Sequence, residues 1–222
     1  MGSPEGELGR GDDETQRRVT ITQGFWLGKH EVTKSQWEAV TGSNPSRFRG
    51  DDLPVVPVSW NEISGSGGFL ERANCFAAGG VRFSLPTEAQ WEYACRAGTT
   101  TALNSGKEST SVVGVCQNLN EVAWYWMTSG NETHPGGLKK ANAWGLHDMH
   151  GNVCEWCADW YGDYPSGPTA DPLGPDSGTN RVYRGGNWNG VAVFCRSAWR
   201  SANAPSTTSL GIGLRLARSS VP

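Results

Sequence analysis

The six cysteines are the residues of this chain best suited to redox or metal chemistry. Cys154 and Cys157 form a Cys-x-x-Cys pair, which binds zinc when a second such pair or two histidines complete the four ligands. The sequence offers no such partner at a recognised spacing. In a strand, residues three apart point to opposite faces, so the two thiols would not converge. The pattern therefore favours buried, inert cysteines over a structural metal, and the even count permits disulfides without requiring them.

His147 and His150 lie three residues apart and suggest a metal-binding or proton-relay pair. Without a third ligand at a recognised spacing, two such histidines in an irregular segment are more often surface or hydrogen-bonded residues. The sequence also lacks a Gly-x-Ser-x-Gly motif, a P-loop and a Gly-rich dinucleotide fingerprint. The residues themselves therefore indicate no hydrolase or nucleotide-dependent enzyme.

The charges are nearly balanced in number but unevenly placed along the chain. There are 19 Lys and Arg against 22 Asp and Glu, and the last acidic residue is Asp176, beyond which six arginines and no lysine follow. Late arginines packed onto early carboxylates would give this split, and so would a basic binding face. Because no lysines or aromatic stacking ladder accompany the arginines, we expect internal pairing and no nucleic-acid partner.

Three capping boxes predict where short helices begin. Each pairs a Ser or Thr with a Glu or Gln three residues later, so that their side chains satisfy free N–H groups at a helix start: Thr33 with Gln36, Ser59 with Glu62, and Thr87 with Gln90. The first helix should stop at Gly42, and the third should span residues 88–97 before Gly98. The second should run to about residue 73, weakened by glycines at 65, 67 and 68.

The remaining regular structure is expected as short strands. Residues 18–22 and 25–28 alternate around a turn at Gly24, and further strands are expected at 153–160, 182–184 and 212–217. Residues 99–145 show no strong helix or strand, which is typical of a packed, functional or ligand-bound region. The 222 residues show no repeat or linker, and they include 30 glycines and 11 tryptophans. We therefore expect one loop-rich α+β domain over residues 1–222.

These ordered motifs resemble one family, the sulfatase-modifying-factor domain, whose fold is that of the formylglycine-generating enzyme and is a variant of the C-type-lectin fold. The resemblance covers the whole chain. The segments that carry it are MGSPEGE at 1–7, GFWLGKHEVT at 24–33, NPS at 44–46, PVSW at 57–60, LPTEAQWE at 85–92, WGLHDMHGNVCEW at 144–156 and GLR at 213–215.

A calcium site is implied by this resemblance. The stretch of the family that corresponds to residues 148–155 binds calcium, which gives the side chains of Asp148 and Glu155 and the carbonyls of Gly151 and Val153 as ligands. Closely spaced carboxylate and carbonyl oxygens suit Ca²⁺. The alternative is a turn in which Glu155 pairs with an arginine.

The family's enzyme activity depends on two copper-binding cysteines, five residues apart, that oxidise a substrate cysteine. The second of them matches Cys195, but the first falls on Gly190. One thiolate cannot make the paired soft-ligand site that Cu(I) prefers. We therefore expect no copper and no formylglycine-generating activity.

The end of the chain is also similar, more narrowly, to the variable proteins of diversity-generating retroelements, including the treponemal variable protein. In that family, codons rich in adenine are mutated between fixed scaffold residues. Residues that resemble the scaffold within 181–219 are Arg184, Gly185, Gly186, Trp188, Cys195, Arg196, Ala198, Arg200, Pro205, Gly213, Leu214 and Arg215.

The candidate variable residues lie between these scaffold residues. Apart from Trp199, which needs an arginine-type template codon, each is an asparagine or is reachable from an asparagine codon by changing only adenines. They are Tyr183, Asn189, Gly190, Val191, Val193, Phe194, Trp199, Ser201, Ala202, Asn203, Ala204, Thr207, Ser209, Leu210 and Gly211. If exposed together, the apolar and aromatic members form a recognition patch; the alternative is that half of them pack in the core.

The residues and motifs leave three candidate functions. The first is a non-catalytic receptor or adhesin-like protein, monomeric, that binds a protein or cell-surface ligand; the second is a formylglycine-generating-enzyme-like oxidoreductase; the third is a calcium-stabilised structural domain. No stretch approaches the roughly 18 apolar residues of a membrane-spanning helix. A receptor would be expected at the cell surface, reached by a signal or lipoprotein segment upstream of this chain.

Overall fold

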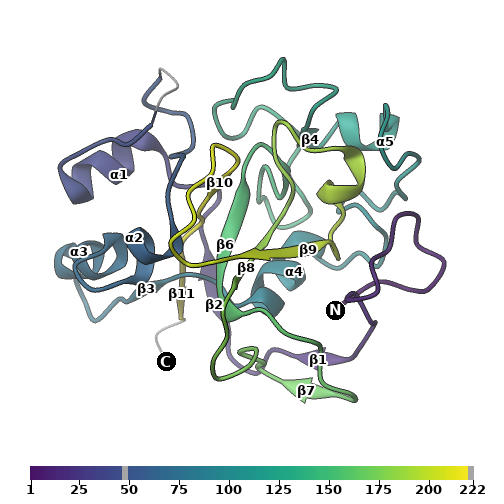
Figure 1. Ribbon diagram of the computed structural model, residues 1–222, viewed down its shortest axis with the longest axis horizontal. Coiled ribbons are helices and arrows are strands. Elements are labelled where there is room, and N and C mark those ends of the chain that lie inside the picture. Colours follow the sequence, from purple (N-terminus) through teal and green to yellow (C-terminus); the bar gives the residue numbers. More distant parts are fainter. Residues whose placement is uncertain (47–49, 220–222) are drawn as a thin grey trace.

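The computed structural model describes residues 1–46 and 50–219 and has short elements joined by long loops (Figure 1). The helices are α1 (Lys34–Thr41), α2 (Trp60–Ser64), α3 (Phe69–Phe76), α4 (Glu88–Arg96), α5 (Gln117–Asn120) and the 3-10 helix η1 (Ala192–Cys195). The strands are β1 (Val19–Thr20), β2 (Phe25–Leu27), β3 (Phe83–Ser84), β4 (Ala123–Trp124), β5 (His150–Gly151), β6 (Cys154–Trp160), β7 (Thr169–Ala170), β8 (Arg181–Arg184), β9 (Arg200–Asn203), β10 (Ile212–Gly213) and β11 (Ala217–Ser219). The α+β class expected from the sequence is confirmed.

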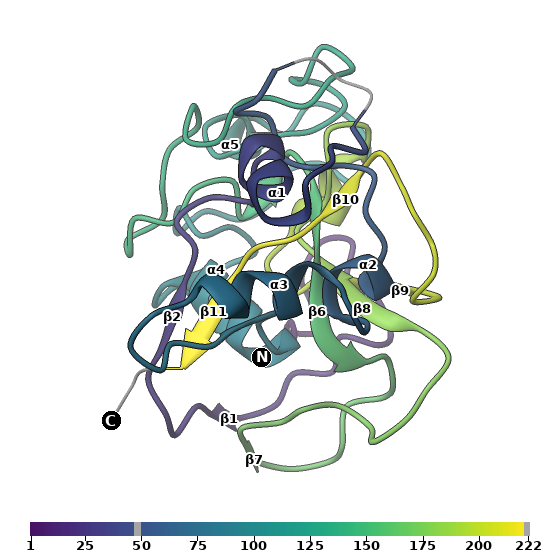
Figure 2. The same ribbon diagram turned by 90° about the vertical axis from the view of Figure 1, so that its left-hand side faces the viewer.

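A four-stranded sheet in the order β10-β6-β8-β9 forms the centre of the molecule. Both faces of β6 are covered, because Cys154 packs in the cluster around Trp156 whereas Cys157 packs in the cluster around Trp91. The two cysteines therefore lie on opposite faces, as their spacing in a strand predicts. Helices α2 and α3 lie to one side of this sheet, and α4 lies to the other (Figures 1 and 2).

The three capping boxes are all present, but the second opens a shorter helix than predicted. The side chain of Ser59 accepts from the backbone of Glu62, yet α2 ends at Ser64 and α3 starts only at Phe69. Gly67 in between has φ +70°, a left-handed conformation that glycine adopts without steric cost. The predicted single helix from Trp60 to about residue 73 is therefore wrong, and the glycines break it into two.

The first two strands, predicted on either side of a turn at Gly24, do not pair with each other in the described structure. β1 pairs in parallel with β7, and β2 pairs antiparallel with β11 from the end of the chain. The predicted strand over 212–217 is likewise split into β10 and β11, which belong to different sheets. These pairings depend on contacts between segments more than a hundred residues apart, so local alternation does not determine them.

Residues 99–145 hold two short elements, α5 and β4, and are otherwise loop. The segment still packs tightly: Leu103, Leu119 and Tyr125 are fully buried in a cluster that also contains Ala192 and Cys195 of η1. Within the described ranges, no helix has the length and apolar character needed to cross a membrane.

Candidate functional site

The scaffold residues predicted within 181–219 lie mainly in the interior. Ten of the twelve are buried, and the other two, Trp188 and Pro205, are partly buried. β8 and β9 pair antiparallel, so that Arg184 lies opposite Arg200 and Tyr183 lies opposite Ser201. The scaffold residues therefore fix the backbone of this segment from within.

Thirteen of the fifteen candidate variable residues are partly buried or exposed. The thirteen lie on β8 and β9, on the turn before and within η1, at Trp199 just before β9, and on the loop from Ala204 to Leu210. The exceptions are Gly190 and Gly211, both of which are buried against Asn187. A Cβ added to Gly211 would lie 2.5 Å from Nδ2 of Asn187, so that side chain would have to move. We call the thirteen accessible residues the recognition face, although Ala202, which pairs with buried Val182, lies on the opposite side of the β8–β9 pair from Tyr183, Ser201 and Asn203.

Aromatic rings form a continuous row from the core to this face. The ring of buried Trp156 meets Tyr183 edge-on, with centroids 5.6 Å apart, and Tyr183 meets Trp199 in the same way at 6.0 Å. Phe194 follows at 5.1 Å from Trp199 and is 40% exposed. Tyr183 and Trp199 thus pack one side against the core and present the rest to solvent, which makes them rigid anchors of low conformational entropy.

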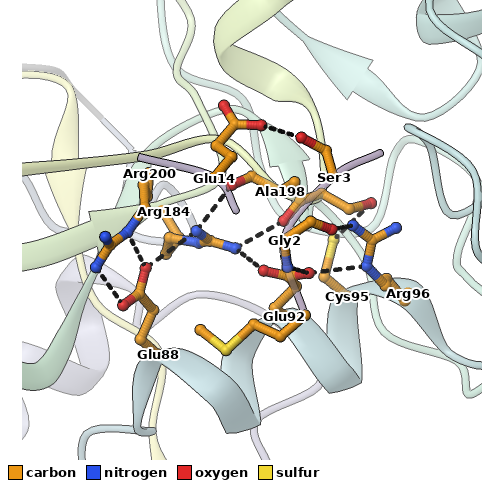
Figure 3. A network of polar contacts seen from close by, with 12 residues as sticks. Gly2, Ser3, Glu14, Glu88, Glu92, Cys95, Arg96, Arg184, Ala198 and Arg200 are labelled. Carbon is orange, nitrogen blue, oxygen red and sulfur yellow. Dashed lines mark hydrogen bonds and ion pairs between the residues drawn. The ribbon is translucent and has the colours of Figure 1, made fainter. Parts of the chain in front are cut away.

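The late arginines are paired internally, as the split of charge along the chain predicts. Figure 3 shows Arg184 between Glu88 and Glu92 of α4, with Nη1 at 3.1 Å and Nη2 at 2.5 Å from their carboxylates. The same guanidinium donates to the carbonyls of Ser197 and Ala198. Glu92 is fully buried, and burial alone would raise its pKa. The nearby charges of Arg184 and Arg96 outweigh this effect and lower the pKa.

Two more of these arginines hold early carboxylates. Arg200 donates to both oxygens of Glu88 at 2.7 Å, as Figure 3 also shows. Arg196 bonds Glu7 and Glu14 at 2.6 Å each and the carbonyl of Gly9 at 2.7 Å. Arg184, Arg196, Arg200 and Arg215 therefore point inward, away from the recognition face. Arg181 is partly buried, stacks on Trp60 and Trp160, and lies on the same side of β8 as Tyr183.

The predicted calcium ligands are only partly available. Both oxygens of Glu155 accept from Nε of Arg215 at 3.0 Å, and Oε2 also accepts from Nε1 of Trp91 at 2.7 Å. This is the alternative in which Glu155 pairs with an arginine. Asp148 accepts from the N–H of Gly137 through Oδ2, but its buried Oδ1 has no hydrogen-bond partner. Among the described residues, no group of three or more His, Cys, Asp or Glu is arranged to hold a metal ion.

Glu31 is a buried carboxylate beside these residues, and it was not predicted as a site residue from the sequence. It accepts from Nδ2 of Asn152 and from the N–H of Val153. Burial, with the nearby charges of Asp148 and Glu155, raises its pKa well above the usual value. A single glutamate before a helix carries no local sign of burial, so only its place in the 24–33 motif could have drawn attention to it.

The cysteine that matches the copper-binding pair is fully buried. A Cβ on Gly186 would lie 2.6 Å from Sγ of Cys195, so the backbone closes over the sulfur. Burial raises the pKa of Cys195 far above that of a free thiol, and the pKa values of Cys154 and Cys157 are raised in the same way. All six thiols are free, and all but Cys75 are buried. The protonated thiol is a poor nucleophile and a poor metal ligand.

The two histidines are hydrogen-bonded and do not converge on a common ligand. His150 accepts at Nε2 from the N–H of Asn104, so Nδ1 carries the proton and donates to the carbonyl of Cys195 at 2.6 Å. Nδ1 of His147 lies 2.8 Å from the carbonyl of Lys139, and its ring stacks on His30. Both act as structural residues.

Comparison with known proteins places this geometry in a family. Residues 1–220 match the model of the sulfatase-modifying factor enzyme 1-like domain. The formylglycine-generating enzyme of Streptomyces coelicolor is 32% identical over 87% of this chain, which spans only 60% of that enzyme.

Solved structures agree with this match. Treponema denticola variable protein 1 superimposes with a TM-score of 0.80 and 30% identity, covering 98% of this chain and 92% of its own. PvdO from Pseudomonas aeruginosa gives a TM-score of 0.82 and 27% identity, covering 99% and 90%. The fold is C-type-lectin-like and loop-rich, and the chain belongs to the sulfatase-modifying factor enzyme 1-like domain family.

Proposed function

We propose that this chain is a non-catalytic ligand-binding protein, a receptor or adhesin, whose recognition face is diversified while its scaffold stays fixed. The observation that carries the proposal is the division of residues 181–219 by burial. Ten of twelve scaffold residues are buried, whereas thirteen of fifteen candidate variable residues reach the surface. A random assignment of core and surface residues would not separate the two sets in this way.

The mechanism follows from where the stabilising interactions lie. Arg184, Arg196 and Arg200 anchor the segment through ion pairs that use none of the face side chains. Replacing a face residue therefore leaves these contacts intact. Because the backbone is ordered before binding, association costs little conformational entropy. The natural place for such a receptor is the cell surface.

The test is a search of the genomic neighbourhood for a reverse transcriptase gene and a near-copy of the codons for residues 181–219. The proposal predicts a near-copy whose differences from the gene are confined to adenines and fall on the codons of the candidate variable residues. A neighbourhood without a near-copy, or differences spread equally over scaffold codons, would contradict diversification.

A copper-dependent oxidase is the second candidate, and the identity to formylglycine-generating enzymes is the observation that favours it. The residues disfavour a copper-dependent oxidase, because Gly190 supplies no thiol and the sulfur of Cys195 is buried against the backbone of Gly186. Incubation with Cu(I) and a sulfatase-derived cysteine peptide, followed by mass spectrometry, tests it. We expect the peptide cysteine to remain unconverted; the mass of formylglycine would reverse the assignment.

A calcium-stabilised structural domain is the third candidate. Its ligand set is Asp148, Gly151, Val153 and Glu155, and of the two carboxylates only Asp148 offers an oxygen without a partner. A calcium ion bound by all four residues would have to draw Glu155 away from Arg215 and Trp91.

A further inference from the structure

The loop of residues 109–131 lies directly against the segment that carries the recognition face. The N–H of Val193 donates to the carbonyl of Val112, and the N–H of Trp126 donates to the carbonyl of Gly190, both at 2.9 Å. Oγ of Ser129 donates to the carbonyl of Trp188 at 2.7 Å. Figure 1 shows the yellow-green turn of η1 beside α5 of this loop.

The inner side of the loop is packed solidly under η1. Cys116, Leu119 and Tyr125 are fully buried in one cluster with Ala192 and Cys195. Tyr125 also donates its hydroxyl to Asn120 and accepts from the N–H of Cys116, which ties the loop to itself. The loop and η1 therefore form one rigid unit.

The outer side of the same loop is apolar and exposed. Five large hydrophobic side chains, between 38% and 53% exposed, stand there. We call them the loop border: Val112, Val113, Val115, Trp126 and Met127. With Phe194 they make up six of the thirteen large hydrophobic residues that are exposed in the described part of the chain. Such a concentration within one loop and the adjoining η1 marks an interaction surface rather than scattered surface residues.

The loop and the face carry little charge. Within residues 109–131 the charged side chain is Glu121, which is exposed and pairs with Lys107 at 2.7 Å, and none of the fifteen candidate variable residues is charged. A second group of exposed aromatic residues, Trp26, Tyr93 and Trp144, lines a separate pocket. A charged partner would lose hydration of its charged groups on the apolar surface of the loop and the face without finding opposite charges to pair with. Binding of a charged partner is therefore unfavourable there.

We infer that the loop border is the fixed half of the recognition surface, and that the partner is a protein with an uncharged, apolar contact surface. This inference rests on the proposed function. Valine and methionine side chains offer no hydrogen bonds, so they contribute only by burying apolar groups. Aromatic residues and methionine are enriched in protein–protein interfaces, and lysine and glutamate are depleted there. The loop border would supply constant affinity while the recognition face selects the partner.

The test uses a random peptide library displayed on phage and selected on the whole immobilised chain. Selected sequences are synthesised, and their dissociation constants are measured by isothermal titration calorimetry. The loop-border variant carries Trp126→Ser and Met127→Ser, the face variant carries Phe194→Ser and Trp199→Ser, and Trp26→Ser in β2 is the control at another exposed tryptophan. Circular dichroism verifies that every variant is folded.

We expect the selected peptides to be apolar and uncharged. Their dissociation constants should change by less than about twofold between low and high salt, because no charges are screened. Both double variants should lose at least about tenfold in affinity, and Trp26→Ser should stay within about twofold of the wild-type chain.

Each remaining outcome overturns a distinct claim. A face variant that loses binding while the loop-border variant binds normally overturns this inference and leaves the proposed function standing. Three outcomes count against both this inference and the proposed function. They are normal binding by both double variants, loss of binding in the loop-border variant alone, and a failure to recover any peptide. Charged, salt-sensitive peptides contradict the partner chemistry. Self-association in sedimentation that the loop-border variant abolishes would make the occupant a second copy of this chain.

Discussion

At the scale of single residues, the buried polar groups decide how stability responds to solution conditions. His150 is fully buried, and burial lowers its pKa from 6.5 to about 4. Between these values the unfolded chain binds the proton and the folded chain does not, so the free energy of unfolding falls as the pH drops from about 6.5 towards 4. We predict that His150 accounts for a loss of about 2 kcal/mol between about pH 7 and 5.

Urea unfolding of the wild-type chain and of His150→Gln at both pH values measures this loss. The variant should be less stable at neutral pH, because the bonds to Asn104 and Cys195 are disturbed, but it should lose less stability on acidification. An identical pH dependence in the two proteins would show that His150 is not the group responsible.

The pairing of Glu155 leads to a prediction about calcium. Since Arg215 already neutralises this carboxylate with three contacts, we expect the melting temperature to move by less than about 2 °C when EDTA replaces millimolar calcium. Differential scanning calorimetry under both conditions provides the measurement. A stabilisation of many degrees by calcium would support the ligand set of Asp148, Gly151, Val153 and Glu155 instead.

At the scale of elements, one arginine connects the beginning of the chain to η1. Arg196 follows this turn and holds Glu7 and Glu14, whose side chains are almost fully buried. Arg196→Ala leaves two carboxylates without their cation, which should lower the free energy of unfolding by about 3–5 kcal/mol. Hydrogen exchange should also accelerate in residues 2–15, because their backbone is tied down through these contacts.

The matched control is Arg10→Ala, since among the described residues the Arg10 side chain makes one long hydrogen bond, of 3.3 Å, to the carbonyl of Ser3. It should change the free energy of unfolding by less than about 1 kcal/mol. Unchanged protection of residues 2–15 in Arg196→Ala would mean that other contacts hold the first segment.

At the scale of the whole molecule, fixed and replaceable residues should differ in their tolerance of substitution. Val191→Asn, Ala202→Thr and Thr207→Tyr combined change only partly buried side chains, so we expect a total cost of about 1 kcal/mol. Leu214→Ala removes a fully buried side chain from the core and should cost about 2–5 kcal/mol. Thermal unfolding distinguishes the two, and equal losses would mean that the face residues are structural.

The structural features that depend on a few neighbouring residues were predicted correctly from the sequence. The capping boxes at Thr33 and Thr87 act over four residues and are formed as expected. The pairing of β2 with β11, by contrast, joins opposite ends of the chain, and no local pattern encodes it. The internal pairing of Arg184, Arg196 and Arg200 followed from the charge split and the absence of accompanying lysines, whereas the exposure of Trp126 and Met127 depends on how the 109–131 loop is folded.

Sequencing the codons of residues 181–219 across a population of the source cells tests whether a buried scaffold displays replaceable side chains. We expect amino-acid changes to fall on the fifteen candidate positions, Tyr183 to Gly211, and to spare buried residues such as Arg184, Arg196 and Leu214. A segment without variation, or variation spread evenly over face and scaffold codons, would contradict this expectation.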